Sequence, residues 1–215
     1  MPDSFRIAVL ISGGGTTLKN LIDKKNCGDL KVNIANVISN NPTAGGLEFA
    51  RAANIETAII DHRLQSDIQQ FSEKLFEECR SAQANLVVMG GFLRRVTIPT
   101  DFVNRVINIH PSLIPAFCGK GLYGLRVHEA VIQYGCKLSG CTVHFVDDQY
   151  DHGPIIAQRS VPVRTDDSPM ELAHRIFEQE CEIYPEVINW IAAGQVHVSD
   201  RRVLIQPSEN RMIVN

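Results

Sequence analysis

The chain has 215 residues, of which 44% are hydrophobic and 21% charged, and its formal net charge at pH 7 is -3. This composition excludes a disordered chain, and the lack of a basic stripe predicts that the protein binds no nucleic acid. No apolar stretch is long enough for a membrane span or a signal-peptide core, so we expect a cytoplasmic protein that binds no membrane.

The first hundred residues alternate between strand-like and helix-like stretches. The apolar run at 7–11 ends in a glycine-rich turn and is typical of a strand buried on both faces. Further strands are expected at 32–39, 57–60 and 86–89, and helices at 16–25, 43–53 and 66–80. This alternation predicts an α/β fold: a doubly wound, Rossmann-like, mostly parallel sheet with helices on both faces.

The second half contains more strands and one long helix. Strands are expected at 106–110, 140–146 and 155–163, with a helix at 127–134. The last helix has a well-marked start, because Ser168 can cap it, Pro169 suits its first position and Glu171 completes a capping box. No linker interrupts the chain, so we expect a single domain at 1–215, with halves at about 1–100 and 101–215.

The glycine-rich turn at 12–17 lies between the first strand and the first helix. Free N–H groups at a helix start, with the helix dipole behind them, favour an anion such as a phosphate. The dinucleotide pattern G-x-G-x-x-G fails at Leu18, and Ser39-Asn40-Asn41 after the second strand offers no acid for a ribose. A nicotinamide dehydrogenase is therefore disfavoured, while a tight turn without a ligand remains an alternative.

Three polar residues form a candidate catalytic group. Asn108 and His110 lie two apart on a strand, so their side chains point to the same face near its carboxyl end. An amide donor beside an imidazole suits a carbonyl whose oxygen gains charge, and a carboxylate from Asp151 would favour the protonated imidazole. Each residue taken alone also has a purely structural alternative: Asn108 as a strand-end cap, His110 as a core histidine and Asp151 as a turn residue. The six cysteines and the histidines lack metal-site spacing, so we expect no metal.

Three stretches, in order, carry a recognisable pattern. The stretch from Asn108 to Pro115 resembles the N-x-H-P-S-L-L-P motif of the folate-dependent formyltransferases. The stretch at 142–156 is similar to that family's second motif, and 10–18 is similar to the phosphate loop of its glycinamide ribonucleotide branch. The resemblance covers about 6–194, nearly the whole chain.

The resemblance implies an activity and a role for each matching residue. A formyl group would pass from 10-formyltetrahydrofolate, the co-substrate, to the amine of glycinamide ribonucleotide in purine biosynthesis, by direct attack through a tetrahedral intermediate. Asn108 would hold the formyl oxygen, His110 would be the general acid, and Asp151 would support His110 and relay protons. The N-terminal half would bind phosphate through Gly15, Thr16 and Thr17, with Glu180 on the ribonucleotide. The expected folate-binding residues are Leu93, Arg94, Arg95, Val96, Asn108, Val146, Asp147, Asp148, Gln149 and Tyr150.

The sequence departs from the family pattern at Thr16-Thr17, where Ser-Asn is usual, at Arg95, where an aliphatic residue is usual, and in the Gly-rich stretch 117–124. We interpret 119–124 as a mobile lid, with a plain surface loop as the alternative. Other functions that remain open are a 10-formyltetrahydrofolate hydrolase, another folate-dependent N-formyltransferase and a non-catalytic nucleotide-binding module. The protein is expected to be a monomer or a homodimer.

Overall fold

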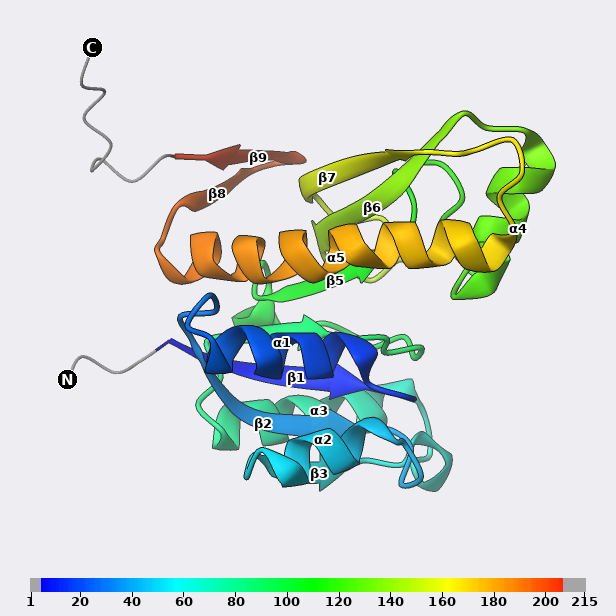
Figure 1. Ribbon diagram of the computed structural model, residues 1–215. Coiled ribbons are helices and arrows are strands. Elements are labelled where there is room, and N and C mark those ends of the chain that lie inside the picture. The colour runs from blue at the N-terminus through cyan, green and yellow to red at the C-terminus, as the bar shows by residue number, and fades with distance from the viewer. Residues whose placement is uncertain (1–4, 207–215) are drawn as a thin grey trace, which may run out of the picture.

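The computed structural model describes residues 5–206, and most of their strands form one seven-stranded sheet in the order β3-β2-β1-β4-β5-β6-β7 (Figure 1). The strands of this sheet are β1 (Arg6–Ile11), β2 (Asn33–Ser39), β3 (Glu56–Ile59), β4 (Leu86–Met89), β5 (Val106–His110), β6 (Leu138–Phe145) and β7 (Ile155–Pro162). The strands β1 to β5 pair in parallel, whereas β6 pairs antiparallel with both β5 and β7. The expected mostly parallel sheet is confirmed.

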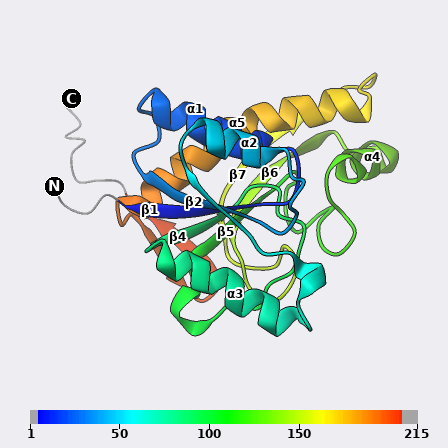
Figure 2. The same ribbon diagram turned by 90° about the horizontal axis from the view of Figure 1, so that it is seen from below.

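Helices cover both faces of the sheet, as Figure 2 shows, with α1 (Thr16–Asn26), α2 (Gly46–Ala52) and α5 (Pro169–Ala192) on one face and α3 (Ile68–Ser81) on the other. The alternation along β1 accounts for the two layers, because Ile7 and Val9 pack in one hydrophobic cluster and Ala8 and Leu10 in the other. A further helix, α4 (Leu125–Tyr134), follows the Gly-rich stretch. Two short 3₁₀ helices span His62–Leu64 and Thr100–Phe102.

Most expected elements are found, and the capping box of α5 is confirmed. The Ser168 hydroxyl accepts a hydrogen bond from the Glu171 backbone N–H, and the Glu171 carboxylate accepts one from the Ser168 N–H. The expected start of a helix at residue 43 was wrong, since α2 begins at Gly46. The Asn41 side chain accepts from the Thr43 N–H and holds a turn there, and Gly46 packs so tightly on Gly15 that a Cβ on Gly15 would collide with it.

The chain after α5 forms a hairpin that the sequence analysis did not anticipate. Strands β8 (Val196–Ser199) and β9 (Arg202–Ile205) pair antiparallel across a turn in which Asp200 has a φ of 53°. The expected domain range includes 1–4 and 207–215, which lie outside the described residues. Within 5–206, no helix combines the length and the apolar composition needed to cross a bilayer.

The parallel strands bring several loops to one edge of the sheet. The glycine turn follows β1, Asn40 and Asn41 follow β2, Gly90 and Gly91 follow β4, and β5 ends at His110. Ligands of open α/β sheets bind at this carboxyl edge. We therefore expect a ligand site at the carboxyl ends of β1, β4 and β5.

Candidate active site

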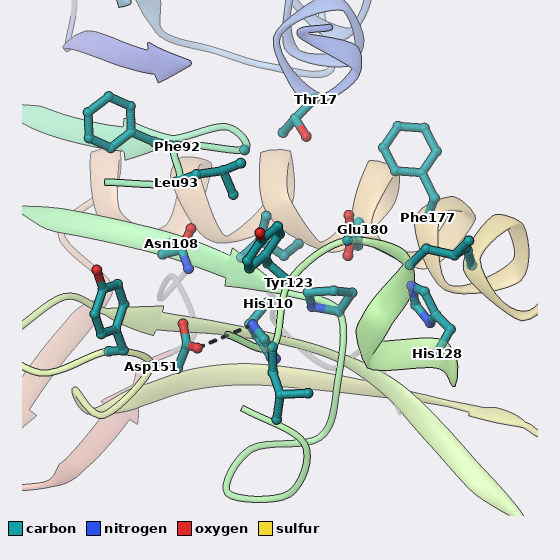
Figure 3. A pocket seen from close by; sticks show the side chains of 18 of the residues that line it. Thr17, Phe92, Leu93, Asn108, His110, Tyr123, His128, Asp151, Phe177 and Glu180 are labelled. Atoms are coloured by element: carbon teal, nitrogen blue, oxygen red, sulfur yellow. Dashed lines mark ion pairs between the residues drawn. The ribbon is translucent and has the colours of Figure 1, made fainter. Parts of the chain in front are cut away.

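Asn108, His110 and Asp151 meet at one cavity of about 400 Å³, and Figure 3 shows their side chains pointing toward one another. His110 Nδ1 lies 3.5 Å from Asp151 Oδ2, and both side chains are largely buried. Asp151 reaches the imidazole because its loop folds back against β6, where Gly153 lies so close to the Phe145 carbonyl that a Cβ would collide with it. The backbone brings together three groups that lie up to 43 residues apart in sequence.

The loop after β5 contacts both members of this pair. His110 Nε2 lies 2.9 Å from the Phe117 carbonyl oxygen, which can only accept, so Nε2 carries a hydrogen and donates it. The Gly119 backbone N–H donates to Asp151 Oδ2 at 2.8 Å. Phe117 and Gly119 both adopt positive φ values, 51° and 96°, which turn the two backbone groups inward. His110 therefore presents Nδ1 to Asp151.

The N-terminus of α1 forms one end of the cavity. Thr16 and Thr17 line the cavity, whereas Gly15 does not line it but adopts the left-handed conformation, with φ 74°, that starts the helix. No side chain caps the first turn of α1, and no acidic residue lies in it. Its N–H groups and its dipole are thus available to an anion.

Another wall of the cavity comes from α5, which packs beside α1 on the same face of the sheet. Glu180 lines the cavity and burial raises the pKa of its carboxyl to about 7. Tyr184, one turn further along α5, lies with its hydroxyl 2.9 Å from the Met89 carbonyl and 3.1 Å from that of Ile107. This buried contact fixes α5 against β4 and β5, so Glu180 lines the same cavity as the candidate catalytic group.

A smaller cavity adjoins the first and shares Phe92, Asn108, Tyr150 and Asp151 with it. Of the residues expected to bind folate, it is lined by Arg94, Arg95, Val96, Asn108, Val146, Asp147, Gln149 and Tyr150, while Leu93 lines the larger cavity. Asp148 lines neither, because its carboxylate lies 3.4 Å from the Ile98 backbone N–H and accepts from it.

A third cavity, of about 650 Å³, opens beside the other two and is basic. Arg63, Arg94, Lys120 and Arg126 line it, and no carboxylate is among its lining residues. Arg63 donates side-chain hydrogen bonds to the Asp61 carboxylate. These hydrogen bonds are the main reason why the pKa of Asp61 is lowered to about 2. The other three cations make no ion pair with a described residue. We call this third cavity the basic cleft.

Several lining residues were missed by the sequence analysis. Phe177 lies three residues before Glu180 on α5, so helical spacing from Glu180 would have found it. His128 on α4 is buried against the cavity, and burial, followed by the charge of His110, lowers the pKa of its imidazole to about 4. Tyr123 also lines the cavity, from the Gly-rich loop. Within residues 5–206, no group of three or more His, Cys, Asp or Glu side chains is placed to hold a metal ion.

Comparison with known proteins identifies relatives over nearly the whole chain. A model of the formyl transferase family matches residues 5–188. The phosphoribosylglycinamide formyltransferase of Haemophilus influenzae is 36% identical over 197 residues, which cover 91% of each chain. The crystal structure of glycinamide ribonucleotide transformylase 1 from Symbiobacterium toebii is similar with a TM-score of 0.89 at 39% identity, covering 96% of each chain.

A formyltetrahydrofolate deformylase from Burkholderia mallei is also similar, with a TM-score of 0.81. It is 24% identical, and the match covers 94% of this chain and 70% of that one. At this identity the likeness is one of fold.

Proposed function

This chain belongs to the formyl transferase family, and on that premise we propose that its cavity transfers a formyl group from 10-formyltetrahydrofolate to the amine of glycinamide ribonucleotide in purine biosynthesis. One observation carries the proposal: an amide, an imidazole and a carboxylate meet at a cavity that an uncapped helix N-terminus also reaches. The amide, the imidazole and the carboxylate suit an acyl carbonyl, and the helix N-terminus suits a phosphate.

The proposed reaction is direct transfer. The substrate amine attacks the formyl carbon, and the carbonyl electron pair moves to the oxygen of a tetrahedral intermediate. The Asn108 amide donates a hydrogen bond to this oxyanion and the positive charge of a protonated His110 stabilises it, while the Asp151 carboxylate balances that charge. As the intermediate collapses, the bond from carbon to the folate nitrogen breaks, and the proton lost by the amine goes to that nitrogen. The products are the N-formyl compound and tetrahydrofolate.

The cavities suggest how the two substrates lie. The phosphate would bind at Thr16 and Thr17, and the ribose would contact Glu180 across the larger cavity. The pteridine would lie in the smaller cavity, which places its formyl group beside Asn108. With the ribonucleotide in the larger cavity, the glutamate tail of the folate would leave through the basic cleft, where Arg94 adjoins the pteridine site.

A hydrolase is the second candidate, because a water molecule could attack the same carbonyl. The relatives named above at 36% and 39% identity carry the names of formyl-transferring enzymes, and the deformylase, at 24% identity, resembles this chain in fold alone. The uncapped start of α1 and Glu180 favour an amine as the nucleophile, because in this proposal they would bind the phosphate and the ribose of the amine substrate.

The test is to mix the protein with 10-formyltetrahydrofolate, with and without glycinamide ribonucleotide, and to follow folate release and the formylated product. Transfer predicts release that depends on the amine and matches product one to one. Release without the amine would instead identify a hydrolase, and no release in either mixture would leave only a binding function. The Asn108→Ala variant is the control for contaminating activity.

A further inference from the structure

We infer that His144 is a positioning residue, which fixes the Asn108 side-chain amide so that an N–H, and not the carbonyl oxygen, faces the formyl group. The inference rests on the proposed function, because it assigns no substrate contact to His144 itself. His144 acts only through Asn108.

The sheet register brings the two side chains together. Asn108 on β5 and His144 on β6 are directly opposite each other in an antiparallel pair. Side chains in such a pair leave the sheet on the same face and lie close enough to interact. Their contact therefore follows from the one antiparallel neighbour that β5 has in this sheet.

The hydrogen bonds of His144 define its tautomer. His144 Nδ1 lies 2.7 Å from the Phe145 carbonyl oxygen, which can only accept, so Nδ1 carries the hydrogen. The side chain is 1% exposed, and burial lowers the pKa of the imidazole. At neutral pH the ring is therefore uncharged, and Nε2 presents a lone pair.

That lone pair decides how the amide of Asn108 lies. Asn108 Nδ2 is 3.4 Å from His144 Nε2 and donates toward it. With the amide turned over, the Asn108 oxygen would face the same lone pair and the two acceptors would repel. One N–H of Asn108 is thus used by His144, and Figure 3 shows the amide nitrogen on the side where His110 and Asp151 lie. The second N–H is free for the formyl oxygen.

The charged groups around His144 are consistent with this arrangement. Asp151 Oδ1 lies 3.8 Å from His144 Nε2, and the charges of Asp147 and His110 also act on the ring. A protonated His144 would turn Nε2 into a donor that pairs with Asp151 and no longer accepts from Asn108. Burial of the ring opposes that protonation.

Two substitutions at His144 separate its positioning role from its packing role. In His144→Gln, the side-chain oxygen reaches the place of Nε2 and still accepts from Asn108. In His144→Asn, the side chain keeps a partner for the Phe145 carbonyl but is too short to reach Asn108. We expect His144→Asn to lose about tenfold to hundredfold in kcat with KM values changed less than threefold, and His144→Gln to keep at least a third of wild-type kcat.

A double-mutant cycle with Asn108→Ala decides whether His144 acts through Asn108. Without the amide there is nothing to position, so Asn108→Ala with His144→Asn should match Asn108→Ala alone in kcat. If the two losses multiply, or if His144→Gln is as impaired as His144→Asn, the inference is overturned. Thermal unfolding of each variant checks that it is folded. Wild-type activity in Asn108→Ala would overturn the proposed role of Asn108 together with the inference, whereas multiplying losses would overturn the inference alone.

Discussion

Asp151 lies between two imidazoles and accepts a backbone N–H from the loop that follows β5. Its carboxylate is 3.5 Å from His110 Nδ1, 3.8 Å from His144 Nε2 and 2.8 Å from the Gly119 nitrogen. Only the first two contacts depend on its charge, because an amide oxygen can also accept from Gly119. A change of Asp151 to Asn therefore removes the charge and leaves the loop contact in place.

We predict that Asp151→Asn loses about a hundredfold to a thousandfold in kcat while its Tm stays within a few degrees of the wild type, because the proposed transition state loses the negative charge that faces His110 in a buried site. Steady-state kinetics and thermal unfolding measure the two quantities. Asp166→Asn, an exposed carboxylate before α5, is the matched control for the lost charge. Equal kcat values for the two variants would refute the role of Asp151.

The spacing of residues within one strand was enough to predict part of this site. Asn108 and His110 lie two apart, so the sequence places them on one face of a strand. Asp151 is 41 residues from His110 and reaches it only through the antiparallel β6 and the fold of the loop beyond it, so its place came from the family resemblance. The contact between Asn108 and His144 depends on strand register, which the sequence did not define.

At the scale of elements, α5 carries a carboxyl group that costs stability when it ionises. An unfolded glutamate has a pKa of about 4.3, and burial raises the pKa of Glu180 to about 7 in the folded protein. The folded state therefore holds a proton that the unfolded state releases. The stability that Glu180 contributes is complete below about pH 4.3 and is lost as the pH rises to about 7.

We predict that Glu180→Gln, which cannot ionise, gains thermal stability over the wild type as the pH rises from 5 to 8. The gain in Tm should reach a few degrees, at about 2–4 °C per kcal/mol for a chain of this size. The titratable groups that interact with Glu180 do not contribute to this trend, since Cys141, Cys181 and Tyr184 stay neutral between pH 5 and 8. Glu129→Gln, which removes an exposed carboxylate of α4, should show no such trend. A constant difference in Tm for Glu180→Gln would contradict the prediction.

Local sequence signals predicted the elements unevenly. The buried run of β1 and the capping box of α5 are strong signals, and both elements lie where they were expected. The start of α2 was misplaced because it depends on a close contact between Gly46 and Gly15, 31 residues apart, which no local pattern reports. The β8–β9 hairpin was missed because its strands have only four residues each and are largely exposed.

At the scale of the whole molecule, charge is distributed unevenly. The chain carries a net charge of -3, yet four cations and no carboxylate line the basic cleft. The cleft combines residues from the β3–α3 connection, the turn after β4, the Gly-rich loop and α4. Sequence composition alone gave no hint of it, because these cations are scattered over more than 60 residues and converge only in the folded sheet.

If the glutamate tail of the folate lies in the basic cleft, extra carboxylates on the tail should strengthen binding. We predict a lower KM for a 10-formyltetrahydrofolate that carries three γ-linked glutamates than for one that carries a single glutamate. Paired removal of Lys120 and Arg126 by alanine substitution should reduce this preference by about threefold to tenfold, since each exposed ion pair contributes up to about 1 kcal/mol. Steady-state KM values for both co-substrates, in both proteins, give the ratio directly.

Salt provides an independent measure of the same attraction. The Debye length falls from about 30 Å at 0.01 M to about 10 Å at 0.1 M ionic strength, so the advantage of the longer tail should shrink as salt is added to the wild type. The paired variant, already short of two cations, should respond less. Lys137→Ala, which removes an exposed cation before β6, should keep the wild-type preference and its salt dependence. If neither salt nor the paired variant changes the preference for the longer glutamate tail, the tail lies outside the basic cleft. That outcome would leave the proposed formyl transfer unaffected.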